Sequence, residues 1–158
     1  MKPVPPDLTI RYEWDSGSLP PPFHFEYTIR IGPGNQGEIE YRPGYPTDQP
    51  PEWVEVFTVS ENRLEQLHRF LIDNMIPARH WQTLSEGFLG GSDANLSGTI
   101  GDEHFSIPGN LIPDNNAVIA PLYTLIQNSV PQSIWKQMDD ERQKYVRERE
   151  GKRRSQKA

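Results

Sequence analysis

The stretch that decides the fold reads Phe23-His24-Phe25-Glu26-Tyr27-Thr28-Ile29-Arg30-Ile31, and the turn Gly32-Pro33-Gly34-Asn35-Gln36-Gly37 leads from it into Glu38-Ile39-Glu40-Tyr41. In the first segment the odd positions are aromatic or aliphatic and the even positions are polar. Because side chains of a strand point alternately to opposite faces, this pattern predicts a strand with one buried and one solvent-facing side. The glycine-rich turn between two alternating runs predicts a β-hairpin.

Further strands are predicted on both sides of this hairpin. Residues 8–14 alternate apolar and polar side chains in the same way. Residues 94–100 and 104–107 predict a short hairpin that turns at Gly101-Asp102, because glycine suits the first central position of a two-residue turn. Residues 53–59 carry apolar side chains at both odd and even positions, so we expect this strand to be covered on both faces.

The first and last of three predicted helices have clear apolar faces. Ser60 is the expected N-cap of a helix over 60–74, because its hydroxyl can accept a hydrogen bond from an unpaired amide of the first turn. Pro131 is expected to begin the last helix. The apolar side chains that recur at helical spacing are Leu64, Leu67, Phe70 and Leu71 in the first helix and Ile134, Trp135, Met138 and Tyr145 in the last.

The middle helix is expected to begin at an asparagine. Asn115 or Asn116 can cap it, and Pro131 ends it. Pro121 then falls near the start of the helix, where the first four amides have no partner within the helix and a missing amide costs little.

The order of these elements indicates the fold class. Strands come early and helices late, with no strand–helix alternation, which predicts an α+β fold: an antiparallel β-sheet of about five to six strands with helices packed on one face. Residues 1–150 are expected to form a single α+β domain and 151–158 a flexible basic tail. The connection 19–22, which contains three prolines, is expected to be extended.

Composition narrows the classes of function. The chain has 158 residues and no cysteine, which excludes disulfides, thiolate metal sites and thiol nucleophiles. The formal charge is −6, and because the tail 151–158 carries four cations, residues 1–150 carry about −10. An acidic body repels phosphate backbones, which argues against nucleic acid as the ligand. With no apolar run long enough for a signal peptide or a membrane span, we expect a cytoplasmic protein with no membrane partner.

The histidines are the candidate metal ligands. His24 and Glu26 stand two apart on one predicted strand and therefore share a face, and His104 could join them if its strand lay nearby. A metal site needs three or four converging ligands, and no His-Glu-x-x-His spacing is present. An ordinary polar sheet face is therefore favoured, and we expect no metal and no cofactor. A metal-binding protein remains an alternative.

The strand carboxylates are the candidate catalytic groups. Carboxylates on adjacent strands lie roughly 5 Å apart, the separation that a retaining glycosidase uses. Arginines share the same strands, however, so cross-strand ion pairs are favoured, and no nucleophile or phosphate-loop signature is present. We assign no catalytic residue. A hydrolase that uses strand carboxylates with His24 or His104 stays open. The carboxylates are Glu13, Glu26, Glu38, Glu40 and Glu55, and the arginines are Arg11, Arg30 and Arg42.

A protein-binding module without chemistry of its own is the favoured function. The strand aromatics are in phase with the buried face, whereas Tyr45 lies in the Pro-rich loop 43–51, where binding groups tend to sit. The partner is expected to be another protein, met by the polar sheet face or by the loops 43–51 and 88–93. An exposed edge strand could also pair two copies into a homodimer. The candidate binding residues are His24, Glu26, Tyr45 and His104.

One resemblance accompanies these features. The run from Ser16 to Tyr27, together with Gly90-Gly91-Ser92 and Ile107-Pro108, resembles a group of uncharacterised bacterial proteins. The resemblance extends over most of the chain and implies one compact domain. It implies no activity, cofactor or catalytic residue.

Overall fold

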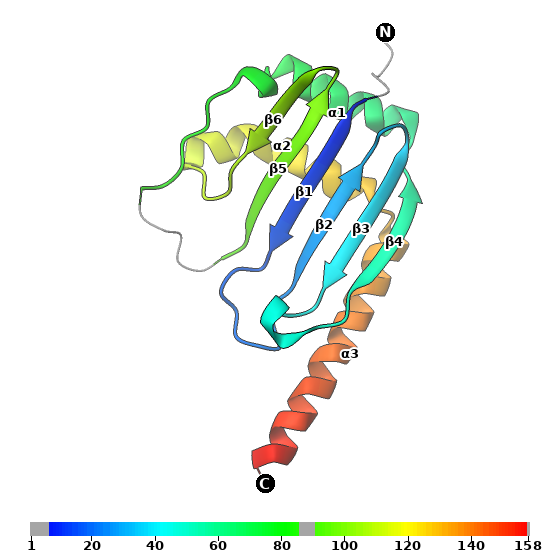
Figure 1. The fold of residues 1–158 in the computed structure, drawn as a ribbon, viewed down its shortest axis with the longest axis vertical. Coiled ribbons are helices and arrows are strands. Elements are labelled where there is room, and N and C mark those ends of the chain that lie inside the picture. Colours follow the sequence, from blue (N-terminus) through cyan, green and yellow to red (C-terminus); the bar gives the residue numbers. More distant parts are fainter. Residues whose placement is uncertain (1–6, 86–90, 158) are drawn as a thin grey trace.

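The antiparallel sheet predicted from the sequence is present in the computed structural model, which describes residues 7–85 and 91–157. Six strands are arranged in the order β4-β3-β2-β1-β5-β6, and all neighbours are antiparallel (Figure 1). The strands are β1 Thr9–Asp15, β2 Glu26–Ile31, β3 Gln36–Arg42, β4 Trp53–Thr58, β5 Asp93–Ile100 and β6 Glu103–Ile107. The predicted α+β class is confirmed.

Three helices pack on one face of this sheet. They are α1 Glu61–Asp73, α2 Pro113–Ser129 and α3 Gln132–Lys157. In Figure 1 all three lie behind the sheet, and in the described part of the chain no helix covers the side that faces the viewer. We call this uncovered side the open face. None of the described helices is long and apolar enough to cross a membrane.

The central hairpin forms as predicted, but its first strand is shorter. Tyr27, Ile29 and Ile31 are buried, whereas β2 begins only at Glu26 and Phe23 is 40% exposed. The reason is that the segment before β2 bonds to the loop after β1. The connection 19–22 was expected to be extended, and this is wrong: the amide of Phe23 donates to the carbonyl of Pro20 (2.8 Å), which closes a turn.

Strand β4 was expected to be covered on both faces, and this too is wrong. Val54 is 50% exposed and Val56 is 72% exposed, because both lie on the open face while the helices pack on the other. Glu55 points the opposite way, where its Oε1 accepts a hydrogen bond from Nε2 of Gln137 in α3 (3.0 Å). Glu55 is therefore not a member of the polar face.

Helix α1 begins and packs as predicted. The hydroxyl of Ser60 accepts a hydrogen bond from the amide of Arg63 (3.1 Å), which satisfies one donor of the first turn. Leu64, Leu67 and Leu71 are buried against the sheet, and each such side chain stabilises the fold by roughly 1.5–3 kcal/mol relative to exposure.

The start of α2 differs from the prediction. The helix begins at Pro113, whose fixed φ suits the first helical position, and neither asparagine caps it. Asn115 Oδ1 instead accepts a hydrogen bond from the amide of Gln82 (2.7 Å). The Asn116 side chain donates to the carbonyl of Leu111 (3.3 Å). Pro121 consequently lies inside the helix, on its exposed side.

Helix α3 follows Pro131 as predicted and extends further than expected. Ile134, Met138 and Tyr145 are buried in the core. The helix continues through Gly151 to Lys157, so the described part of the segment predicted as a tail is helical. Its last turns extend beyond the sheet (Figure 1). The flexibility of 151–158 stays a prediction.

The core between sheet and helices contains polar groups that are paired with one another. Nε2 of Gln127 in α2 lies within hydrogen-bond distance of the hydroxyls of Tyr12 (3.4 Å) and Tyr27 (3.0 Å). Burial raises the pKa of Tyr27 to about 12, because a phenolate would lose its hydration there. These buried phenols therefore stay protonated and serve packing.

Candidate functional site

The register of the strands places a row of charged side chains across one end of the open face. Asp15 of β1 stands between Asp93 of β5 and Glu26 of β2, and Glu26 is opposite Arg42 of β3. Nη2 of Arg42 forms an ion pair with Oε1 of Glu26 (3.0 Å). Three carboxylates thus lie side by side, and a single guanidinium ends the row.

The loop after β1 reaches this row through Gly17. Its amide donates to Oδ1 of Asp15 (2.8 Å), and its φ of +83° lies in the left-handed region that glycine adopts readily. A side chain at this position would also overlap the carbonyl group of Gly91. Glycine therefore lets the backbones of the two loops touch.

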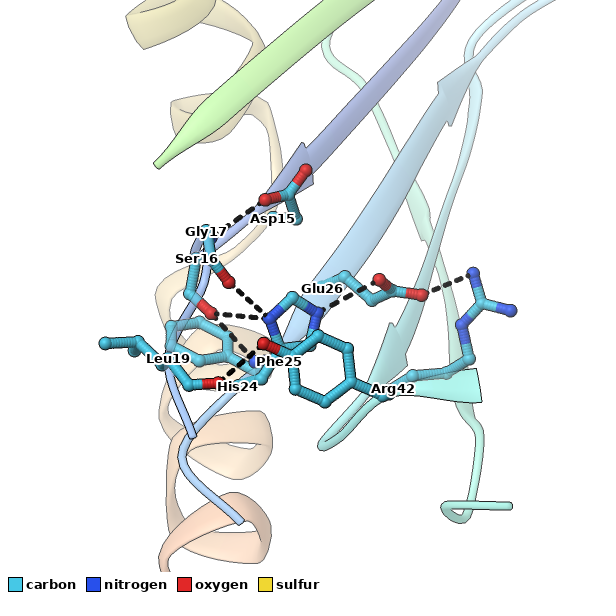
Figure 2. Close-up of polar contacts among 9 residues, drawn as sticks. Asp15, Ser16, Gly17, Leu19, His24, Phe25, Glu26 and Arg42 are labelled. Atoms are coloured by element: carbon cyan, nitrogen blue, oxygen red, sulfur yellow. Dashed lines mark hydrogen bonds and ion pairs between the residues drawn. The ribbon is translucent and has the colours of Figure 1, made fainter. Parts of the chain in front are cut away.

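His24 is the central side chain of the site and is only 4% exposed (Figure 2). Its Nδ1 donates to the carbonyl oxygen of Gly17 (2.7 Å), and its Nε2 lies 3.3 Å from Oε2 of Glu26. Both bonds can be donated at once only by the protonated ring, which would then form an ion pair with Glu26. The ring stacks on Tyr45 at 3.8 Å with 9° between the planes. The Tyr45 hydroxyl donates to the carbonyl of Leu19 (2.6 Å).

Ser16 stands beside this histidine without forming a nucleophile pair. Its Oγ is 3.4 Å from Nδ1 of His24, but that nitrogen makes its shorter bond to a carbonyl oxygen. The Ser16 hydroxyl accepts a hydrogen bond from the amide of Phe25 (3.0 Å), and the side chain is buried. The arrangement joins the loop after β1 to the chain before β2, and the buried Ser16 hydroxyl is not exposed to a substrate.

The sequence-predicted site residues are therefore only partly brought together. His24, Glu26 and Tyr45 meet and line one shallow hollow of about 380 Å³. His104 does not join them: it lies on the edge strand β6 opposite Thr99, which pairs with Thr9 at the other end of β1. His24 was expected on the polar strand face; it lies instead in the loop before β2 and is buried. In residues 7–85 and 91–157, no three histidine or carboxylate side chains are placed so that they could hold a metal ion.

Ion pairs occupy the middle of the open face, as the sequence predicted. Nη1 of Arg30 contacts Oε1 of Glu38 (3.1 Å) and Oε2 of Glu40 (3.0 Å) on the neighbouring strand. A hydrogen bond with Glu52, assisted by Arg30, lowers the pKa of Glu40, and the same contact raises the pKa of the exposed Glu52. Exposed pairs of this kind contribute roughly 0–1 kcal/mol each, so they order the face more than they stabilise the fold.

The open face has a negative balance. Six carboxylates face three guanidiniums on the strands, a formal charge of −3. The carboxylates are Glu13, Asp15, Glu26, Glu38, Glu40 and Asp93, and the arginines are Arg11, Arg30 and Arg42.

Sequence reasoning missed two members of the row. Asp15 and Asp93 were not singled out, although Asp15 follows the last apolar residue of β1 and Asp93 stands at the start of β5. Strand ends that carry carboxylates were the available signal. What the sequence does not contain is the register that puts those ends side by side.

No protein-family model matches the chain, and a comparison with curated proteins finds no match. The resemblance to uncharacterised bacterial proteins stays a prediction.

Proposed function

We propose that the protein is a non-catalytic binding module whose open face contacts a partner protein with a basic surface. The observation that carries this proposal is a six-stranded sheet with one uncovered side, on which carboxylates outnumber arginines two to one. Complementary charge steers association and selects partners, so a negative face favours a lysine- and arginine-rich surface.

An apolar strip borders these charges. Val54 and Val56 are exposed on β4, directly opposite Glu40 and Glu38 of β3. An interface gains affinity mainly from apolar groups that it removes from water, and charged neighbours set its orientation. The two valines therefore supply a contact that a purely charged face would lack.

Ion pairs hold the charged side chains in place before a partner arrives. Arg30 spans Glu38 and Glu40, and Arg42 holds Glu26, so these long side chains have less conformational freedom to lose on binding. The loop 43–51 borders the face through Tyr45. Of the second predicted loop, residues 88–90 lie outside the described part of the chain.

The hydrolase alternative has less support. Both ring nitrogens of His24 have partners, and His104 lies at the other end of the sheet. Oε1 of Glu26 is held by Arg42, and its Oε2 faces the imidazole. A general base needs a free lone pair within reach of substrate. His24 has a carboxylate neighbour but is buried, whereas His104 is exposed but has no carboxylate partner among the described residues.

The proposal is tested by reversing charge on the open face. Three forms of the protein are used to capture partners from lysate. They are the wild type, the double variant Glu13→Lys/Glu38→Lys, and the matched control Glu141→Lys/Glu148→Lys, which changes exposed positions of α3. The captured protein is then purified, and its affinity for all three is measured by interferometry at two salt concentrations.

We expect the open-face variant to bind the partner at least tenfold more weakly, the control to bind like wild type, and added salt to weaken the wild-type complex. Equal binding by both double variants would overturn the proposal. So would a mass of twice 18.2 kDa in light scattering that falls to the monomer mass in the open-face variant, because the face would then bind a second copy.

A further inference from the structure

A second hollow lies on the open face, at the end away from His24. It has a volume of about 370 Å³ and is bordered by residues of the four neighbouring strands β2, β1, β5 and β6. The polar side chains that line it alternate along their strands with buried residues, so they belong to the open face. We call it the His104 hollow. These side chains are Thr9, Arg11, Arg30, Ser97, Thr99 and His104.

The charge of this hollow differs from that of the face as a whole. Arg11 and Arg30 contribute two guanidiniums and His104 contributes an imidazole, and in residues 7–85 and 91–157 no carboxylate belongs to the lining. The hollow beside His24, in contrast, is lined by the three carboxylates of the row. The open face is therefore acidic at one end and basic at the other.

Strand register brings the two guanidiniums together. Arg11 of β1 stands directly opposite Arg30 of β2, and like charges in this position destabilise a strand pair. Nε of Arg11 donates to Glu13 (2.6 Å), and Nη1 of Arg30 donates to Glu38 (3.1 Å) and Glu40 (3.0 Å). A guanidinium has five N–H donors, so each arginine keeps donors that these carboxylates do not use. An anion between the two arginines would bind those donors and offset the repulsion.

Two further donors border the hollow. Oγ1 of Thr99 donates to the carbonyl of Asp7 (2.8 Å) and therefore accepts from Oγ1 of Thr9 (2.8 Å), so both threonine protons are used. The Ser97 hydroxyl and the exposed His104 ring form no hydrogen bond with the residues that the structure describes. A serine hydroxyl and an imidazole each have an N–H or O–H group to donate. The unused polar groups of the hollow are thus donors, and they call for an acceptor.

We propose that the His104 hollow binds a phosphate monoester group. Two guanidiniums match a dianion, and the planar fork of arginine donates in pairs to phosphate oxygens. The volume lies within the range of roughly 300–1,000 Å³ for small-molecule sites, so it accommodates the phosphate and part of what carries it. A small phosphorylated metabolite and a phosphorylated side chain of another protein present the same group. This inference goes beyond the proposed function of the open face and does not depend on it.

The acidic end of the face does not prevent such binding. Arg11 and Asp15 stand four residues apart on β1, which is roughly 13 Å at about 3.3 Å per residue. Salt at physiological strength screens exposed charges over about 8 Å. The backbone of a nucleic acid would extend over the carboxylates as well as the arginines, whereas a single phosphate group contacts the basic hollow alone.

The test is a titration of the full chain followed by NMR. The probes are glycerol 3-phosphate and phosphoserine blocked at both backbone ends. The control is blocked serine with sodium chloride at the same ionic strength, which supplies the carrier and the salt without the phosphate. We expect both phosphate probes to produce saturable shifts in the amide signals of Ser97 and His104 and in the Nε–Hε signals of Arg11 and Arg30, and the control to produce none.

Three variants test the chemistry of the hollow. We expect Arg11→Gln and Arg30→Gln each to bind the phosphate probes at least tenfold more weakly, because each loses charge-assisted hydrogen bonds. Ser97→Ala removes a single hydroxyl and should bind about threefold more weakly. Arg69→Gln is the matched control, since it removes an ion-paired arginine from α1, and it should bind like wild type. Urea unfolding establishes that each variant is folded, and S97A keeps the test valid if an arginine variant is not.

Each result decides the proposal. Tighter binding of blocked phosphoserine supports a phosphorylated side chain as the source of the group, and tighter binding of glycerol 3-phosphate supports a small metabolite. The absence of saturable shifts with both phosphate probes, or equal shifts with the control, would overturn the proposal. So would a loss of affinity in R69Q as large as in R11Q and R30Q, because binding would then depend only on the net charge of the protein.

Discussion

Each end of the open face carries a histidine, and the surroundings of the two histidines differ. At one end His24 is buried, bonded through both ring nitrogens and stacked on Tyr45. At the other end His104 is exposed on an edge strand, and its side chain forms no hydrogen bond with the residues that the structure describes. The difference comes from the loops: the chain before β2 folds over one end, whereas His104 stands near the tight turn at Gly101. Histidines that look alike in the sequence thus differ in what surrounds them.

The largest expected effect comes from disrupting the contact between the two loops at the His24 end. Gly17→Ala must adopt a left-handed φ and also displace Gly91, so we expect a loss of about 3 kcal/mol in the free energy of unfolding. Gly34→Ala is the matched control, because its φ of +78° is similar and no atom lies near its Cβ position. It should lose about 1 kcal/mol. Equal losses in urea denaturation would show that the loops do not pack tightly.

Removing each histidine compares the two ends directly. His24→Ala deletes a buried stacked ring and leaves the Gly17 carbonyl unpaired, so we expect a loss of about 2 kcal/mol. His104→Ala should stay within about 0.5 kcal/mol of wild type, as exposed substitutions usually do. Thermal or urea unfolding measures both. If the two variants lost the same stability, His24 would not be the centre of a packed cluster.

The smallest expected effect concerns pH and the middle of the face. The pKa of Glu40 is lowered below its ordinary value of 4.5 in the folded protein, so its contribution to stability is present above that value and is lost as pH falls through the folded pKa. Glu40→Gln should therefore lose less stability than wild type on acidification below about pH 4.5. Urea midpoints at pH 6 and pH 3.5 measure this difference. Glu148→Gln, on exposed α3, is the control and should follow wild type.

Most of the architecture follows from local pattern. Alternation placed Tyr27, Ile29 and Ile31 in the core, and the Ser60 cap and the Gly101 turn were visible as short-range signals. One prediction failed because a competing partner lay far away in the chain: Asn115 binds the amide of Gln82 instead of capping α2. The prediction for β4 failed because no helix of the described residues covers the face that carries Val56.

The candidate site was harder to predict for the same reason. The pairing of His24 with Glu26 follows from their spacing, but the burial of His24 depends on Gly17 and Tyr45, which come from two other loops. Asp93 reaches the row only through strand register. Periodicity reports which side of a strand a residue occupies, and it contains nothing about which loop closes over the strand's end.

Helix α3 gives the molecule an electrical polarity. Lys152, Arg153 and Arg154 stand on its last turns, which extend past the sheet in Figure 1, while the carboxylates gather on the strands. A helix of 26 residues is roughly 39 Å long at 1.5 Å per residue, and Nη1 of Arg153 near its end donates a hydrogen bond to the carbonyl of Pro21 (3.2 Å). The positive helix tip therefore adjoins the loop that joins Asp15 to Glu26, and a charged neighbour that approaches this end meets fields of both signs.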